Sequence, residues 1–216
     1  MTTFYTENRK CPCCGRTFET KALTSFNTFG PRSTDGYQAA SGYQPIKFII
    51  DSCSLCGYTF EPSELEGEVT MTLKEKVHQR LTPIVKKKGP FPQSKYEWAA
   101  LIAEWREDSF LTIGHLYLKA AWDCNVSDKP KGEKVYRIKA IEYFQKAFQE
   151  NKIPEDAMPE YLYLIGELYR RVGDREASIN WLDRVSEAIG KDGAKKWLID
   201  LAEQQKTHPK DFFDET

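Results

Sequence analysis

The sequence predicts an α+β protein whose strands and helices are segregated along the chain. Five of the six cysteines fall within the first 56 residues, in a stretch rich in Ser, Thr, Gly and Phe. The composition changes near residue 62, and the rest of the chain has apolar residues at three- and four-residue spacing. We therefore expect a small N-terminal domain of short antiparallel strands over 1–61 and a mostly α-helical domain over 62–216.

Length and charge narrow the class of protein. The 216 residues are 40% apolar and 29% charged, which is enough to bury one large core or two small ones. The 31 basic and 32 acidic residues nearly cancel. No run approaches the roughly 18 apolar residues of a membrane span, and the first ten residues lack the apolar region of a secretory signal. We expect a cytoplasmic protein that does not enter the membrane.

The N-terminal segment is expected to form short strands. β-branched and aromatic content predicts strands at 16–23, 45–51 and 57–60.

The remainder is expected to form helices at 63–82, 94–107, 109–123, 133–150, 156–172, 174–189 and 192–205. Pro83 should break the first helix from the second, and Asp108 or Ser109 should cap the third. Gly173 and Gly190 suit left-handed helix ends, with Asp174 and Asp192 ready to cap the helices that follow. Residues 125–134 read as an exposed loop, and the tail from His208 is expected to fray.

Two cysteine pairs carry the strongest chemical signal. Cys11, Cys14, Cys53 and Cys56 form two CxxCG motifs. A CxxC turn holds two sulfurs about 3.5–4 Å apart, which suits a tetrahedral ion with Zn–S bonds near 2.3 Å. The glycine after each pair allows a left-handed backbone there. The pattern predicts a zinc ribbon with one structural Zn²⁺ bound by these four residues.

The connection between the pairs is long. Residues 15–52, 38 in all, exceed the roughly 15–20 of a compact ribbon. The surplus at 24–44 is expected to loop out, either as a solvated excursion or as a recognition loop. Four sulfur ligands leave no position on the metal for water, so metal catalysis is disfavoured. We expect no enzyme activity, no catalytic residues and no small-molecule substrate.

Cys13 allows a second interpretation of the first motif. Cys13 should point away from the metal and is expected to be a spare thiol, but Cys11-Pro12-Cys13-Cys14 also looks like the CPxC motif of thiol redox proteins. Redox chemistry requires a helix that begins at the motif and lowers the thiol pKa. A glycine and a strand-like segment follow instead, which favours the metal site.

Two helical stretches share a pattern. Gly114 and Gly166 each precede an aromatic residue by three positions, and small residues recur later at Ala140 and Ser178. This resembles the tetratricopeptide repeat, in which a small residue lets two helices of an antiparallel stack approach closely. Gly114 and Ala140 lie 26 positions apart, whereas Gly166 and Ser178 lie 12 apart, so the first unit departs from the repeat.

Such stacks bind peptides or proteins in a concave groove. Mapping the two units onto the repeat gives the groove candidates Leu111, His115, Leu118, Tyr163, Glu167 and Arg170.

The combination of motifs is similar to a bacterial family known as domain of unknown function 2225. The resemblance is carried by Cys11–Gly15, Phe18, Lys21, Asp35, the stretch Tyr43-Gln44-Pro45, Phe48 and CxxCGY at 53–58, followed by the repeat-like helices. It covers nearly the full length. The resemblance implies a zinc-ribbon head and a helical tail, and it implies no particular activity.

The leading hypothesis is a non-enzymatic zinc-binding adaptor that mediates protein–protein interaction. The alternative is a nucleic-acid-associated zinc ribbon, since many ribbons belong to transcription or RNA machinery. Residues 1–61 contain six basic and five acidic side chains, and this excess of one charge is small for phosphate contacts. A CxxC redox protein is the third possibility.

Overall fold

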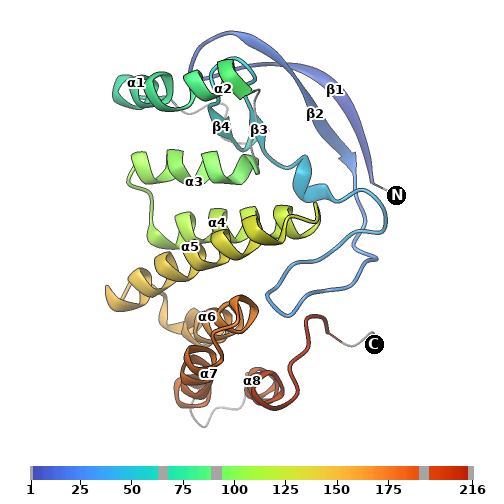
Figure 1. Ribbon diagram of the computed structural model, residues 1–216, viewed down its shortest axis with the longest axis vertical. Helices are drawn as coiled ribbons and strands as arrows, with labels where there is room; N and C mark the ends of the chain where they lie inside the picture. Colours follow the sequence, from blue (N-terminus) through green and yellow to red (C-terminus); the bar gives the residue numbers. More distant parts are fainter. Residues whose placement is uncertain (1, 63–67, 89–93, 190–194, 214–216) are drawn as a thin grey trace.

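The elements of the computed structural model are stacked in layers along its long axis (Figure 1). The structure describes residues 2–62, 68–88, 94–189 and 195–213. The strands and the first two helices form one end, and the last three helices form the other. Residues 26–44 run down one side from the strands toward the last helices. The predicted segregated α+β class is confirmed.

Two small antiparallel sheets form the N-terminal end. β1 (Thr3–Lys10) pairs with β2 (Thr17–Ser25), and β3 (Asp51–Ser52) pairs with β4 (Thr59–Phe60). The predicted strands at 16–23 and 57–60 correspond to β2 and β4. β1 was not predicted. None of its residues is fully buried, so its sequence lacks the alternation of apolar and polar residues that indicates a strand.

The strand predicted at 45–51 is wrong apart from its last residue. Residues Pro45–Lys47 form a 3-10 turn that begins at the proline. Ile46 and Ile50 are both buried against the helical core. A spacing of four residues places side chains on one face of a helix. The prediction relied on the β-branched content of this segment and overlooked that spacing.

Eight helices lie within the described residues. Their bounds are α1 (Met71–Arg80), α2 (Thr82–Lys88), α3 (Lys95–Trp105), α4 (Phe110–Asn125), α5 (Pro130–Gln149), α6 (Met158–Val172), α7 (Arg175–Ile189) and α8 (Lys196–Thr207). Thr70 and Ser109 cap α1 and α4 by accepting hydrogen bonds from backbone N–H groups. Gly173 ends α6 with φ +91°, as predicted. Gly190 and Asp192 lie outside the described residues.

Two boundaries differ from the prediction at prolines. The loop expected at 125–134 is wrong, because α5 begins at Pro130. Pro83 lies in the first turn of α2 instead of breaking the helix before it. A proline is tolerated in the first turn of a helix, where its missing N–H has no partner within the helix.

Three buried clusters hold the layers together. One surrounds the cysteines and includes Leu73 and Val77 from α1, Leu81 between α1 and α2, and Trp98 from α3. A second joins α3–α6, and the third joins α6–α8. The first cluster has members on both sides of the predicted boundary at 61, so the N-terminal end shares its core with the helices that follow. The division into 1–61 and 62–216 stays a prediction.

The helices that carry Gly114 and Gly166 each pack closely on the next helix. A Cβ atom at Gly114 would lie 2.6 Å from the Phe144 ring, and one at Gly166 would lie 2.7 Å from Leu182 Cγ. These glycines therefore set how closely α4 approaches α5 and α6 approaches α7. The geometry agrees with the role that the repeat pattern assigned to the two residues, while membership of the repeat class stays a prediction.

We expect Gly166→Leu to lower the free energy of unfolding by about 1–3 kcal/mol or more, because the side chain has no room against Leu182. Chemical denaturation monitored by circular dichroism measures this change. Gly36→Leu is not a suitable control, because Gly36 has φ +93° and its replacement would strain the backbone. Ala157→Leu, at the half-buried position before α6, is the control and should have a smaller effect. An unchanged midpoint for Gly166→Leu would contradict the close packing.

Candidate metal centre and the cavity between the helices

The four predicted ligands come together at one point. The Sγ atoms of Cys11 and Cys56 are 3.7 Å apart, those of Cys14 and Cys53 are 3.8 Å apart, and all four lie within 4.8 Å of one another. Sulfurs around a tetrahedral ion with bonds near 2.3 Å are separated by about 3.5–4 Å. The cluster therefore fits a single metal ion, with one ligand pair following β1 and the other following β3.

The two cysteine turns have the same backbone design. Gly15 N donates to Cys11 O at 2.9 Å, and Gly57 N donates to Cys53 O at 2.8 Å. Both glycines have positive φ, +70° and +84°, which a residue with a side chain rarely adopts. The N–H of Leu55 also points to Cys53 Sγ at 3.4 Å, and such hydrogen bonds stabilise a thiolate. The repeated geometry explains why CxxCG was a reliable signal.

The crowding of the sulfurs shows what a metal would contribute. Hydrogen bonding to Cys53 raises the pKa of the Cys11 thiol to about 12, and hydrogen bonding to Cys11 raises the pKa of the Cys56 thiol. Without a cation, these thiols keep their protons near neutral pH. A bound divalent ion would stabilise four thiolates and release the protons, so its affinity is expected to rise with pH.

The other two cysteines are not members of the cluster of four. Cys13 is half-buried beside the cluster, and Cys124 is buried in the helical core. All six cysteines are free thiols. The first CxxC lies in a turn between β1 and β2, and no helix begins there. The redox hypothesis required such a helix, so the structure does not support it.

The insertion at 24–44 is not looped out, which corrects the prediction. Asp35 is buried, and its carboxylate accepts hydrogen bonds from Arg137 on α5 and from Trp122 Nε1 on α4, the latter at 2.9 Å. Tyr37 packs on the Trp122 ring, with 5.5 Å between the ring centroids. Phe29, in contrast, is 84% exposed. The insertion is thus anchored at its centre and exposed nearer its start.

A buried ion network surrounds this anchor. Arg137 is only 2% exposed and binds both Asp35 and Glu133. Burial alone would raise the pKa of Asp35, but the charges of Arg137 and Arg171 outweigh it and lower this pKa to about 2. Asp35 therefore stays ionised at neutral pH and stabilises the contact between the insertion and the helices.

We expect this contribution to disappear in acid. A carboxyl whose pKa is depressed by folding, here from 3.8 to about 2, stabilises the fold above pH 3.8 and loses its contribution as the pH falls toward 2. The shift corresponds to about 2 kcal/mol. The difference in unfolding free energy between the wild type and Asp35→Ala should shrink by about this amount between pH 5 and pH 2, as measured by urea denaturation. A constant difference would contradict the assignment.

The predicted groove residues lie in different environments. Leu118, Tyr163 and Glu167 are buried, and Tyr163 Oη donates to the carbonyl of Thr34 at 3.1 Å. His115 is half-buried and hydrogen-bonded to Tyr161 Oη at 2.7 Å, and burial lowers its pKa. Leu111 and Arg170 are half-buried, Leu111 against the helical core and Arg170 against Glu167. The insertion therefore covers part of the face that the repeat pattern assigned to a groove.

A cavity of about 730 Å³ remains beside this covered face. It is lined by α4, α6, α8, residues 32–36 and the C-terminal Phe212 and Phe213, and it includes His115, Leu118 and Tyr163. The tail was expected to fray from His208, which is wrong for residues 209–213. Phe213 N donates to Arg32 O at 3.0 Å, and Thr34 N donates to Asp211 O at 3.0 Å.

Comparison with known proteins places the chain in a family. The profile of a family described as an uncharacterized protein conserved in bacteria (DUF2225) matches residues 4–208. The chain belongs to this family. The matched range contains both cysteine pairs, the insertion and seven predicted helices, so the family resemblance inferred from the motifs is confirmed. No curated protein and no solved structure matches the chain significantly. Within the described residues, none of the helices has the length and apolar character needed to span a bilayer.

Sequence reasoning missed most of the ion network. Arg137 follows Tyr136 and precedes Ala140 and Ile141, all of which are buried, so a charged residue lies on an apolar helix face. Glu133, four residues before it, is the matching acid. A charge on an apolar face with an opposite charge at i−4 was the available signal. Asp35 gave no such signal, because it lies in an irregular segment.

Proposed function

We propose that the chain is a non-enzymatic adaptor, in which one zinc ion stabilises the N-terminal end and the cavity between α4, α6 and α8 binds a protein or peptide. The observation that carries the proposal is the cavity itself. Apolar and aromatic side chains line most of it, and Trp197 at its edge is 57% exposed. Concave, largely apolar surfaces with a few polar groups are typical binding sites, and exposed tryptophan is frequent among the residues that dominate binding.

Zinc is the metal that best suits the cysteine cluster. Four thiolates with tetrahedral spacing are typical of Zn²⁺ or of an iron–sulfur centre, and two CxxCG turns at strand ends are typical of the structural zinc sites of ribbons. Four protein ligands leave no coordination position for water, which supports a structural role over catalysis. Free cysteines throughout the chain support a reducing compartment such as the cytoplasm.

The test is site-specific photo-crosslinking with the full-length protein. A photoreactive residue at position 197 should capture a partner protein that the same residue at position 71 does not, although Met71 is 70% exposed at the other end of the molecule. Trp197→Ala should then weaken the purified pair by about tenfold or more, and Met71→Ala should not. Equal capture at the two positions would contradict the proposed site.

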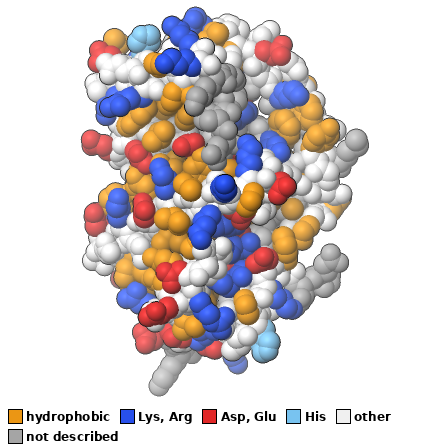
Figure 2. Space-filling view, in the orientation of Figure 1, with side chains coloured by type: hydrophobic (Ala, Val, Ile, Leu, Met, Phe, Trp, Pro, Cys, Tyr) orange, Lys and Arg blue, Asp and Glu red, His pale blue; other side chains and the backbone are white. Residues whose placement is uncertain are grey.

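One observation favours a second candidate function, nucleic-acid binding. Arg16, Lys74, His78 and Lys86 line a hollow of about 350 Å³ beside Cys13 and Cys14, and none of the described residues that line it is acidic. On the face in Figure 2, however, acidic, basic and apolar side chains are interspersed. A salt-dependent mobility shift of labelled RNA that Lys74→Ala and Lys86→Ala weaken would support this function, and no shift at physiological salt would exclude it.

A further inference from the structure

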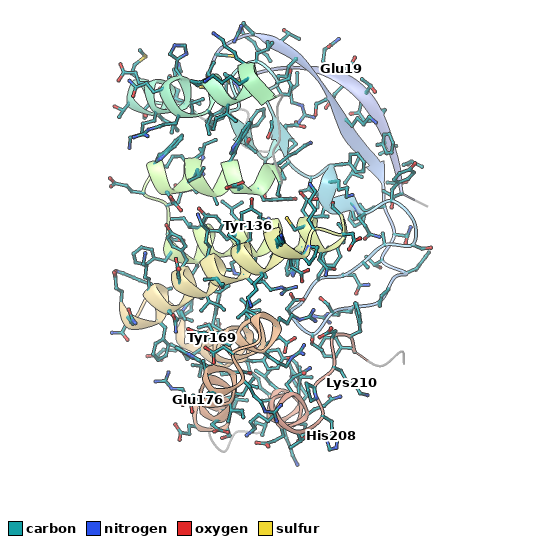
Figure 3. The ribbon with its side chains drawn as sticks, viewed as in Figure 1. Glu19, Tyr136, Tyr169, Glu176, His208 and Lys210 are labelled. Carbon is teal, nitrogen blue, oxygen red and sulfur yellow. The ribbon has the colours of Figure 1, made fainter. Side chains whose placement is uncertain are left out.

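The C-terminal tail packs against the rest of the chain in the way that an extended peptide binds to a receptor protein. Lys210 follows α8 and lies beside the insertion (Figure 3). Residues 211–213 continue antiparallel to residues 32–34, with a β-bridge between Ser33 and Phe212. The two flanking backbone hydrogen bonds, from Thr34 N to Asp211 O and from Phe213 N to Arg32 O, are both 3.0 Å long. This is the geometry in which proteins bind peptides by strand addition.

Two arginines on α6 grip the tail at one residue. Arg170 Nη2 donates to Asp211 Oδ1 at 2.7 Å and to Lys210 O at 3.1 Å. Arg171 Nη2 donates to Asp211 O at 2.5 Å, and the backbone N–H of Thr34 donates to the same carbonyl at 3.0 Å. The two arginines therefore donate hydrogen bonds to the Asp211 side chain and to two backbone carbonyls of the tail. Charged donors at this point favour an acidic residue at position 211.

Three residues that contact the tail, Thr34, Arg170 and Arg171, are also hydrogen-bonded to a residue outside the tail. Glu167 is fully buried and binds all three of them: Thr34 Oγ1 at 2.6 Å, Arg170 Nε at 2.7 Å and Arg171 Nε at 2.8 Å. We call Arg32, Thr34, Arg170 and Arg171 the cradle. Because Glu167 orients three of its members, the cradle is expected to keep its shape when the tail leaves, which lowers the cost of binding a different peptide.

The tail itself is lightly held. Asp211 is 60% exposed at its side chain and Phe212 is 48% exposed. Both Phe212 and Phe213 line the 730 Å³ cavity, and the Arg32 guanidinium lies 5.5 Å from the Phe213 ring centroid. The site thus binds an acidic residue followed by aromatic residues. The tail leaves part of the neighbouring cavity unfilled. A peptide that fills this space gains contacts that the tail lacks, so it can replace the tail.

We propose that the cradle binds an extended segment of a partner protein, with an acidic residue followed by aromatic residues, and that the chain's own Asp211-Phe212-Phe213 occupies it until the partner displaces it. This inference rests on the proposed adaptor function and specifies its ligand. The tail is the argument for the ligand's chemistry, because it shows which main-chain and side-chain groups the cradle accepts.

The test uses the full chain and a labelled synthetic peptide of residues 207–213, with binding followed by fluorescence anisotropy. Asp211→Ala should bind the peptide about tenfold more tightly than the wild type, because the competing tail has lost its ion pair while the peptide has kept its own. A peptide with alanine in place of its aspartate should bind Asp211→Ala about tenfold more weakly. Adding Arg170→Ala to Asp211→Ala should abolish the gain.

Matched variants keep the test decisive. Phe213→Ala weakens the tail from its other end and should also bind the peptide more tightly than the wild type. Asp183→Ala removes an acid that is 55% exposed and pairs with Lys206 away from the cradle, and it should behave as the wild type. Circular dichroism establishes that each variant is folded.

Three outcomes would overturn the proposal: equal affinity of the wild type and Asp211→Ala for the peptide, no binding to any variant, or equal affinity of the two peptides. Dimers that the peptide dissociates, detected by light scattering, would assign the cradle to the tail of a second copy and would also overturn it. Crosslinking from position 197 is independent, so a failed peptide test with successful capture there would reject the cradle and keep the adaptor function.

Discussion

Cys56→Ser should lose the bound metal and unfold the N-terminal end of the protein. Binding of a structural zinc supplies about 10 kcal/mol or more of folding free energy in small metal-dependent domains, and one serine in place of a thiolate forfeits much of it. Domains are stable by only about 5–15 kcal/mol, so the strands around the cysteines are not expected to survive. Elemental analysis of the purified variant should show a fraction of the metal found in the wild type.

The loss should spread to α1–α3 and stop before the last helices. Cys53 and Cys56 share a buried cluster with Val77, Leu81 and Trp98, whereas α6–α8 have a cluster of their own. Hydrogen exchange should therefore accelerate in α1–α3 and stay slow in α6 and α7. Cys13→Ser is the matched control, because Cys13 adjoins a ligand without belonging to the cluster of four, and it should keep one metal ion. A full complement of metal in Cys56→Ser would contradict the site.

Asp35→Ala should destabilise the protein by about 3 kcal/mol or more, because it leaves the buried Arg137 without its closest acid. Removing one partner of a buried pair costs far more than the pair contributes, because the remaining charge has lost its hydration; among the described residues, Arg137 would keep Glu133 as its acidic partner. The midpoint of urea denaturation at pH 7 measures this change. The insertion should also become accessible to limited proteolysis in the variant.

Asp108→Ala provides the comparison for this variant. It breaks the ion pair with Arg106, whose two side chains are 33% and 21% exposed. Pairs in contact with solvent contribute about 1 kcal/mol or less, so Asp108→Ala should stay close to the wild type. Equal losses of stability in the two variants would mean that burial of the Asp35–Arg137 pair has no special weight.

Several local features of this protein could be predicted from its sequence. The CxxCG turns depend only on a five-residue pattern, and the four ligands followed from it because each turn fixes its own geometry. Helices α3–α7 were predicted from the spacing of their apolar residues and from capping residues such as Ser109. Gly114 and Gly166 were singled out for close packing, and the structure shows Phe144 and Leu182 against them.

Features that leave no local pattern in the sequence could not be predicted. β1 is stabilised by pairing with β2 and carries no apolar face to reveal it. The insertion looked like a solvated loop because its composition is polar, but Asp35 finds Arg137 102 residues later. The tail looked disordered because Asp211 meets Arg170 only in the folded protein. The errors at the insertion and at the tail both came from a polar residue whose partner lies far along the chain.

The long sequence separation of these contacts has a consequence for how the chain folds during synthesis. The hydroxyl of Thr34 donates to Glu167, 133 residues later, and its backbone N–H donates to the carbonyl of Asp211, 177 residues later. The four cysteines can come together once Cys56 has emerged from the ribosome, whereas residues 32–36 lack their partners until residues 211–213 have emerged. Because non-local contacts form slowly, we expect the nascent protein to pass through a state in which the two cysteine turns have formed and the insertion has not yet docked. This state should last until the residues around 210 have been synthesised.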